Sequence, residues 1–127
     1  MFKKLLIIII PFLLFSCSSR VDEAEVKKAR QFFESVFQDN VLESPEFQAS
    51  LGYKSNYDKW DDITWQASRQ RAYRAKDDLA YLEKNIDFDK LDESSKISYR
   101  LMVKRLQRTI DNDKFIFHNY LITHRGG

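Results

Sequence analysis

Apolar and small residues between positions 65 and 86 recur at alternating steps of three and four. The positions that carry this pattern are Trp65, Ser68, Ala72, Ala75, Leu79, Leu82 and Ile86. A helix gathers such positions on one face, whereas a half-buried strand needs alternation with a period of two. A second stripe follows a linker at 85–95, and Asp113 and Lys114 interrupt it. Its members are Tyr99, Met102, Val103, Leu106, Ile110, Phe117 and Leu121.

The remainder of the chain after position 21 also predicts helices with short connections. Residues 22–40 have helical spacing, carried by Val26, Ala29, Phe33 and either Val36 or Phe37. Ser44 and Pro45 form an N-cap and a first helical position, and this short helix should stop at Gly52. Residues 53–62 predict an ordered loop. Because long helices with short connections pack antiparallel, we expect an all-α fold, an antiparallel helical hairpin or small bundle.

The first sixteen residues have the order of a secretory signal peptide. Lys3 and Lys4 form a short positive region, residues 5–15 are apolar except for Pro11, and the small Ser16 precedes Cys17. The apolar run is roughly half of the ~20 residues that a membrane-spanning helix needs. We therefore expect cleavage rather than a permanent membrane span.

Cys17 is the single cysteine, and it stands where a bacterial lipoprotein carries its acyl chains. Residues 14–17, Leu-Phe-Ser-Cys, resemble a lipobox, in which the thiol is joined to diacylglycerol and the peptide is cleaved before the cysteine. Several acyl chains, at about 0.8 kcal/mol per buried methylene, make a durable anchor. The sequence predicts a signal peptide over 1–16, a lipidated tether over 17–21, and a membrane as the partner of Cys17. An ordinary cleaved signal peptide with an incidental cysteine is the alternative.

Two further features concern the location and the partners of the mature chain. Ser18 stands where an aspartate retains some lipoproteins in the inner membrane, so the outer membrane is favoured over the inner.

The net charge of the mature chain bears on its partners. Removing Lys3 and Lys4 from the 21 lysines and arginines leaves 19, the same number as aspartates and glutamates. A neutral chain has no overall basic field that would recruit nucleic acid or an anionic membrane. We therefore expect no nucleic-acid partner.

Three side-chain groups are candidates for chemistry. Asp87, Asp89 and Asp92 suggest calcium, but Leu91, Asp92 and Ser98 stand where a calcium loop needs an oxygen ligand, a glycine and a bidentate acid. Helix capping by Asp92 or Ser94 is the simpler interpretation.

The two histidines raise the question of zinc. His118 and His124 would point about 120° apart on a helix, unlike the two histidines of a zinc peptidase helix. The third candidate is a run of basic residues on one predicted helix, which could in principle bind nucleic acid. Its members are Arg69, Arg71, Arg74 and Lys76. Acids follow on the same helix, and this favours a solvated helix face with salt bridges. We expect no catalytic residue, no metal ligand and no cofactor in this chain.

The order of segments resembles the amino-terminal region of the bacterial family called domain of unknown function 885. The likeness is carried by SPEFQASLGYKSNYDKWDD at 44–62, LEKNIDFDKLDESSKISYRLM at 82–102 and FIFHNYLITHRGG at 115–127. Members of this family resemble zinc metallopeptidases, are largely helical and are much longer. Their His-Glu-x-x-Pro-Gly-His segment has no counterpart here, so the resemblance implies no catalytic residue, and zinc is expected only in a full-length member.

Two hypotheses of different classes follow. In the first, residues 22–127 are the incomplete helical front of a lipid-anchored metallopeptidase-like envelope protein, inactive alone, and Gly126 and Gly127 mark a truncation. Its partner is then the remainder of its own larger fold. In the second, the chain is a complete small helical lipoprotein that binds another envelope protein.

Overall fold

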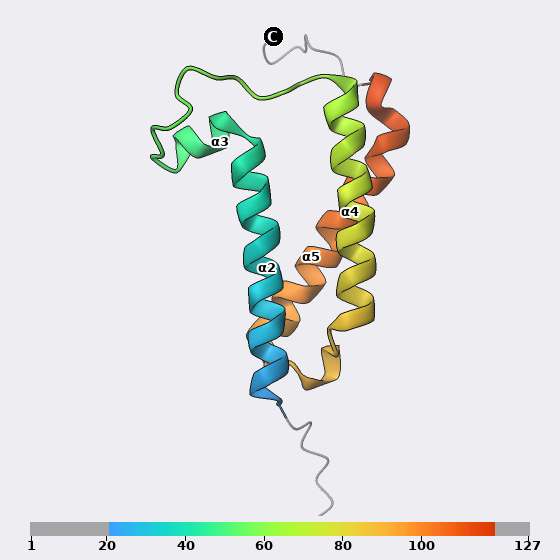
Figure 1. The fold of residues 1–127 in the computed structure, drawn as a ribbon. Coiled ribbons are helices and arrows are strands. Elements are labelled where there is room, and N and C mark those ends of the chain that lie inside the picture. Colours follow the sequence, from blue (N-terminus) through green and yellow to red (C-terminus); the bar gives the residue numbers. More distant parts are fainter. Residues whose placement is uncertain (1–20, 119–127) are drawn as a thin grey trace, which may run out of the picture.

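The computed structural model describes residues 21–118, and all regular structure in this range is helical (Figure 1). The all-α prediction is confirmed. The α-helices are α2 (Glu23–Glu43), α3 (Pro45–Ser50), α4 (Trp65–Asn85) and α5 (Glu93–Asn112). Two short 3₁₀ helices, η2 (Phe88–Lys90) and η3 (Asp113–His118), precede and follow α5.

Each α-helix begins where a side-chain oxygen accepts a backbone N–H of the first turn. The capping residues are, in chain order, Asp22, Ser44, Thr64 and Asp92. Ser44 accepts from the N–H of Phe47 at 3.0 Å, with Pro45 at the first helical position, as predicted. The chain leaves α3 through Gly52, whose φ of 88° lies in the left-handed region that favours glycine.

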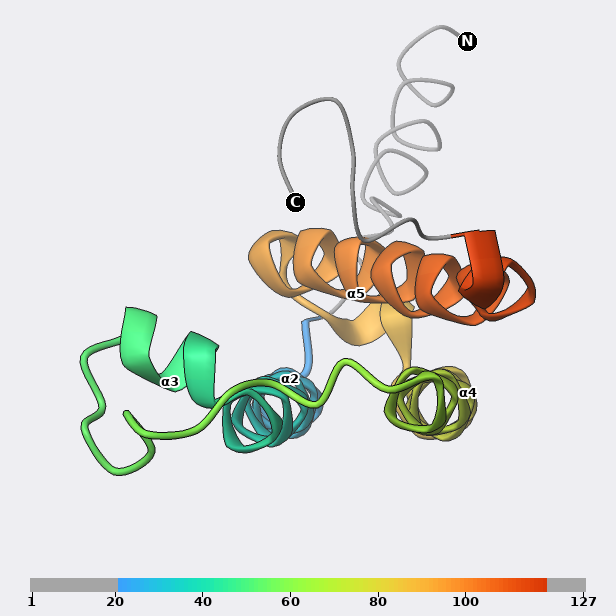
Figure 2. The same ribbon diagram turned by 90° about the horizontal axis from the view of Figure 1, so that it is seen from above.

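The three long helices form two layers. α2 and α4 run in opposite directions beside each other, and α5 crosses them on one side (Figures 1 and 2). The most extensive helix contact is between α4 and α5. Long side chains bridge α2 and α4, because the ring of Phe32 stacks on that of Tyr81 with 4.7 Å between centroids.

The core lies at the end of the molecule where α2 begins, α4 ends and α5 begins. Its buried members are Val26, Ala29, Leu82, Ile86 and Leu91. Leu91 is fully buried although it lies in the predicted linker, since η2 turns it toward the helices. The N–H of Asp22 donates to the carbonyl of Lys90 at 2.9 Å, which fixes the start of α2 against this linker.

Two expectations for the apolar stripes are wrong at their ends. Phe117 was expected on the buried face and is 74% exposed, and Trp65 is 47% exposed. The helix changes at Asp113 from α to 3₁₀, which has three residues per turn and shifts the inward position to Ile116. On α2 the structure selects Val36, at 5% exposure, over Phe37. Leu121 lies outside the described residues.

Candidate functional site

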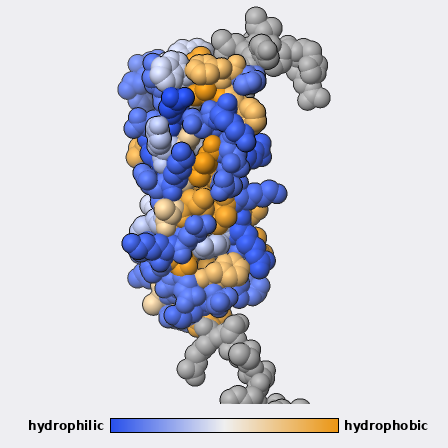
Figure 3. Space-filling model, turned by 90° about the vertical axis from the view of Figure 1, so that its right-hand side faces the viewer, coloured by the Kyte–Doolittle hydropathy of each residue, from blue (hydrophilic) through white to orange (hydrophobic). Residues whose placement is uncertain are grey.

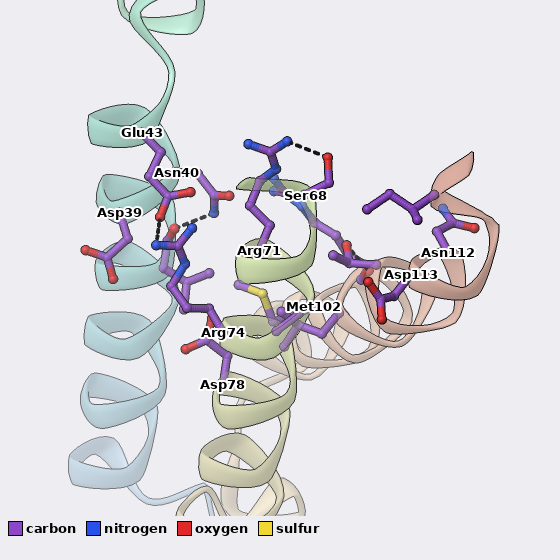
Figure 4. A pocket seen from close by; sticks show the side chains of 16 residues that line it. Asp39, Asn40, Glu43, Ser68, Arg71, Arg74, Asp78, Met102, Asn112 and Asp113 are labelled. Atoms are coloured by element: carbon purple, nitrogen blue, oxygen red, sulfur yellow. Dashed lines mark hydrogen bonds and ion pairs between the residues drawn. The ribbon is translucent and has the colours of Figure 1, made fainter. Parts of the chain in front are cut away.

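A cleft of about 380 Å³ opens between α2, α4 and α5, beyond the core cluster (Figure 4). Apolar side chains, including Val36, Met102 and Leu106, lie among its lining residues. Charged side chains from three helices surround them. These are Asp39 and Glu43 of α2, Arg71, Arg74 and Asp78 of α4, and Arg105 of α5.

Arginines of α4 organise one side of this cleft. Nη1 of Arg74 lies 2.5 Å from Oε1 of Glu43 and so joins α4 to α2 (Figure 4). Arg71 donates to Oγ of Ser68 at 3.1 Å and to the carbonyl of Asp62 at 3.3 Å. Steps of three and four place 71, 74 and 78 on neighbouring parts of one helix face.

Asp78 is an acid of the cleft whose pKa is raised. Burial raises the pKa of its carboxyl, and the negative charges of Asp39 and Asp77 raise it further, against an opposing effect of Arg74. A partly buried carboxylate beside like charges favours a proton or a cationic partner. The cleft is therefore suited to hydrated polar groups rather than to an apolar ligand.

Arg69 holds η3 against α4. Its Nε lies 3.8 Å from Oδ1 of Asp113, and these two buried atoms have no hydrogen-bond partner among the residues that the structure describes. The pair is thus an ion pair without hydrogen-bond geometry. It positions the 3₁₀ segment that contributes Ile116 to the cleft.

A second candidate surface is the arm, which we define as residues 45–64, comprising α3 and the loop that follows it. Asp61 closes the arm, because its Oδ2 accepts from Oγ of Ser44 at 2.6 Å and its Oδ1 from the N–H of Glu46 at 3.0 Å. Buried Gln48 donates to the carbonyl of Val41 at 2.9 Å and accepts from Asn56 at 2.7 Å.

The outside of the arm is rich in exposed apolar and aromatic side chains. They are Phe47, Leu51, Tyr53, Tyr57, Trp60 and Ile63. Trp60 is 84% exposed and Ile63 is 76% exposed. Single exposed apolar residues are common, and it is their number on one segment that makes the arm a candidate surface.

The acidic residues of the linker act as caps. Asp87 accepts from the N–H of Asp89 at 3.2 Å at the start of η2, and Asp92 accepts from that of Ser95 at 2.8 Å at the start of α5. The structure thus selects Asp92 over Ser94 as the cap of α5.

Cys17 and His124 lie outside the described residues, so their predicted roles stay predictions. His118 is the last residue of η3, and its ring centroid lies 5.6 Å from that of Phe115. Among residues 21–118, no group of three histidine, cysteine or acidic side chains could hold a metal ion. None of the helices described combines the length and apolarity that crossing a bilayer requires.

The basic run takes part in salt bridges, as expected, but the acids that pair with Arg69 and Arg74 lie on other elements than α4. Arg74 pairs with α2 and Arg69 with η3. Lys76 lies over the ring of Tyr73, 5.3 Å from its centroid. The arginines therefore join elements instead of forming a uniform solvated face.

Comparison with protein families decides what the chain is related to. The family described as "Bacterial protein of unknown function (DUF885)" matches residues 45–125, well over half of the chain. The chain belongs to the DUF885 family. This confirms the resemblance drawn from the sequence. The DUF885 match includes the arm, α4 and α5, while α2 precedes it. No curated protein and no solved structure matches the chain.

Sequence reasoning identified the basic run that contains Arg71 and Arg74, but it missed that these residues meet acids of α2 in a cleft. Asp39 and Glu43 are one helical turn apart on α2, and Asp78 is one turn from Arg74 on α4. This spacing places each pair on one helix face. The spacing within one helix carries no information on which helices face each other, so the cleft could not be assembled from the sequence.

Proposed function

We propose that the chain is a lipid-anchored, non-catalytic helical module of a metallopeptidase-like envelope protein. It tethers the protein to a membrane through Cys17 and provides a surface against which a further helical part packs. Membership of the DUF885 family supports the coarse assignment. The metallopeptidase-like relation and the anchor come from the resemblance and from the lipobox.

The observation that carries the packing role is the exposed aromatic arm. Tyrosine and tryptophan are enriched in protein interfaces because each offers a large apolar area with a polar tip. Trp60 and Tyr57 are 84% and 62% exposed, on a segment that hydrogen bonds hold in one shape. The internal core is small, with only Leu82 and Leu91 as large, fully buried side chains among the described residues.

The proposed occupant of the arm is another helical segment of the same family fold. The arm lies inside the residues that the family match covers, so it is part of what the family shares. The resemblance further implies members that are largely helical and much longer than this chain. A segment absent from this chain would then cover Trp60 and Ile63.

Co-expression tests this packing. The chain is expressed with the separately tagged remainder of a longer family member, and co-purification is measured. Replacing Trp60 and Ile63 together (Trp60→Ser, Ile63→Ser) should lower recovery at least tenfold, because about 1.4 kcal/mol of lost contact suffices for that factor. Tyr73→Ser is the matched control, since Tyr73 is 57% exposed on α4 outside the arm. Equal recovery with all variants, or none with the unaltered chain, would contradict the packing role.

A self-sufficient binding module is the second candidate. It is favoured by the complete set of helix caps and by the closed arm, which order the described residues without another chain. Thermal unfolding separates the two. A packing module should bind a hydrophobic dye and melt broadly, whereas a self-sufficient module should melt sharply as a monomer without binding dye.

A further inference from the structure

One helix of the chain, α5, carries charges mostly of one sign. No aspartate or glutamate occurs between Ser94 and Ile110, a stretch that covers most of α5. Five cations occur there, and they are Lys96, Arg100, Lys104, Arg105 and Arg108. The overall neutrality of the mature chain therefore conceals one strongly basic helix.

Most of these cations lie on the outer side of α5. The buried residues Ser95 and Leu106 mark the inner side of the helix. Exposed Ile97, Leu101, Lys104 and Arg108 follow one another at steps of four, three and four on the opposite side. Figure 2 shows α5 as a layer of its own, with α2 and α4 together on one side of it.

The outer side of α5 combines positive charge with apolar surface. Ile97 and Leu101 are 56% and 63% exposed at its centre. A groove of about 690 Å³ along the same helix is lined by Phe88, Tyr99 and Val103, by three cations and by one acid. The charged lining residues are Arg100, Lys104, Arg108 and Asp111. Figure 3 views α4 and α5 from the side and shows a narrow apolar band between hydrophilic surfaces; the outer side of α5 lies at the edge of this view.

The structure gives an ion pair to one of the five cations within residues 21–118. Lys96 reaches Oε1 of Glu93 at 3.2 Å. The guanidinium of Arg100 lies 5.1 Å from the ring centroid of Phe88, a contact that leaves its charge uncompensated. Unpaired cations around exposed aliphatic side chains are the pattern of a helix that lies on an anionic membrane surface.

The position of the tether brings α5 to the membrane. The N–H of Asp22 bonds to the carbonyl of Lys90, so the chain from Cys17 reaches the fold beside the start of α5. Residues 17–21 span at most about 18 Å when extended, and the helical part of α5 is about 30 Å long. An anchor at Cys17 therefore keeps α5 within reach of the headgroups. In this respect the inference rests on the proposed lipid anchor.

We propose that the outer side of α5 binds the headgroups of anionic phospholipids. Lys104 and Arg108 meet the phosphates, and Ile97 and Leu101 enter the boundary between headgroups and acyl chains. The helix then lies along the membrane, while α2, α4 and the arm face away from it. This surface adds a charge-dependent contact to the acyl anchor and fixes the orientation of the chain on the membrane.

Fluorescence quenching on vesicles tests the orientation. A fluorescent amino acid replaces Leu101 in the full chain purified after expression in bacteria, and a headgroup-labelled lipid quenches it. Vesicles are phosphatidylcholine alone or an equal mixture with phosphatidylglycerol. Quenching should be several-fold stronger on the anionic vesicles and should fall at high salt. The same amino acid at Tyr73, on α4, should be quenched equally on both.

Charge reversal supplies the matched comparison. The pair Lys104→Glu and Arg108→Glu should reduce the anionic quenching roughly tenfold or more. The pair Lys54→Glu and Lys59→Glu reverses two charges in the arm and should leave it unchanged. Circular dichroism confirms that both pairs keep their helices.

Vesicle flotation separates this inference from the anchor. If the chain floats with both kinds of vesicle but position 101 is not quenched, the proposal that α5 binds lipid headgroups is wrong and the proposal of an acyl anchor stands. Flotation with anionic vesicles only, abolished by reversal at Lys104 and Arg108, supports the α5 surface and shows that the anchor fails. Flotation with neither overturns both.

Discussion

Nη2 of Arg30 on α2 lies 2.6 Å from Oδ2 of Asp92, the residue that caps α5. The other oxygen of the same carboxylate accepts from the N–H of Ser95 at 2.8 Å. Nε of Arg30 also donates to Oγ of Ser95 at 3.3 Å. One carboxylate therefore starts α5 and ties it to α2, next to the core.

The first prediction concerns the pH dependence that Asp92 creates. The hydrogen bonds from Ser95, and then the charge of Arg30, hold the pKa of this carboxyl below its usual value. Its stabilising contribution is therefore present above the usual pKa of about 3.9 and is lost as the pH falls through the lowered pKa. Asp92→Asn should keep much of the cap but flatten the dependence of the melting temperature on pH below about 4. Asp92→Ala should melt lowest at neutral pH. Identical pH profiles for the native chain and Asp92→Asn would refute the assignment.

The second prediction concerns Asp78 in the cleft, whose contribution to stability changes with pH in the opposite direction to that of Asp92. The pKa of Asp78 is raised, so its stabilising contribution is complete only below the usual pKa and is lost as the pH rises through the raised value. Asp78→Asn should therefore stabilise the chain at neutral pH, by up to about 0.5 kcal/mol given its partial exposure. This gain should vanish near pH 3. Denaturant unfolding at both pH values measures it, with Asp58→Asn, at an exposed position in the arm, as the control. Destabilisation by Asp78→Asn at neutral pH would show that its charge is compensated.

The third prediction concerns the core. Leu82 is fully buried within the cluster formed by α2, α4 and the linker. Leu82→Ala should cost about 2–5 kcal/mol through lost burial and an unfilled cavity. This is a large part of the total of about 5–15 kcal/mol that a domain has, so cooperative unfolding should weaken or disappear. Leu42→Ala, at a side chain that is 72% exposed, should change the free energy of unfolding by less than about 0.5 kcal/mol.

The fourth prediction concerns the anchor. Cells that express the chain should incorporate a fatty-acid probe through Cys17, and Cys17→Ala should abolish the labelling. Ser19→Ala is the control, because it alters a small residue two positions further along. Equal labelling of the native chain and Cys17→Ala would rule out acylation at this position.

Local order was predictable from the sequence because it depends on neighbours. Apolar spacing located the long helices, and Ser44 and Pro45 located the start of α3. The same reasoning placed Val26, Ala29, Leu82 and Ile86 on the inner faces, and the structure buries all four.

The remaining features depend on residues far apart in the chain. Arg30 and Asp92 are separated by 62 positions, and nothing in their local sequence indicates that they meet. The cleft likewise needs the crossing of three helices. At Asp113 the helix changes to 3₁₀, and each backbone hydrogen bond then spans one residue fewer. The spacing of apolar residues in the sequence cannot distinguish this from an α-helix.

The Asp61 contact with Ser44 joins positions 17 residues apart and closes the arm before any partner arrives. A loop of that length held open would lose conformational entropy on binding, by an amount that grows with the logarithm of its length. In this chain the conformational entropy of the loop is lost when the arm folds and not when a partner binds. In the proposed packing role, a partner would therefore meet Trp60 and Ile63 on a backbone that is already ordered, and the cost of ordering that loop would not be subtracted from the affinity.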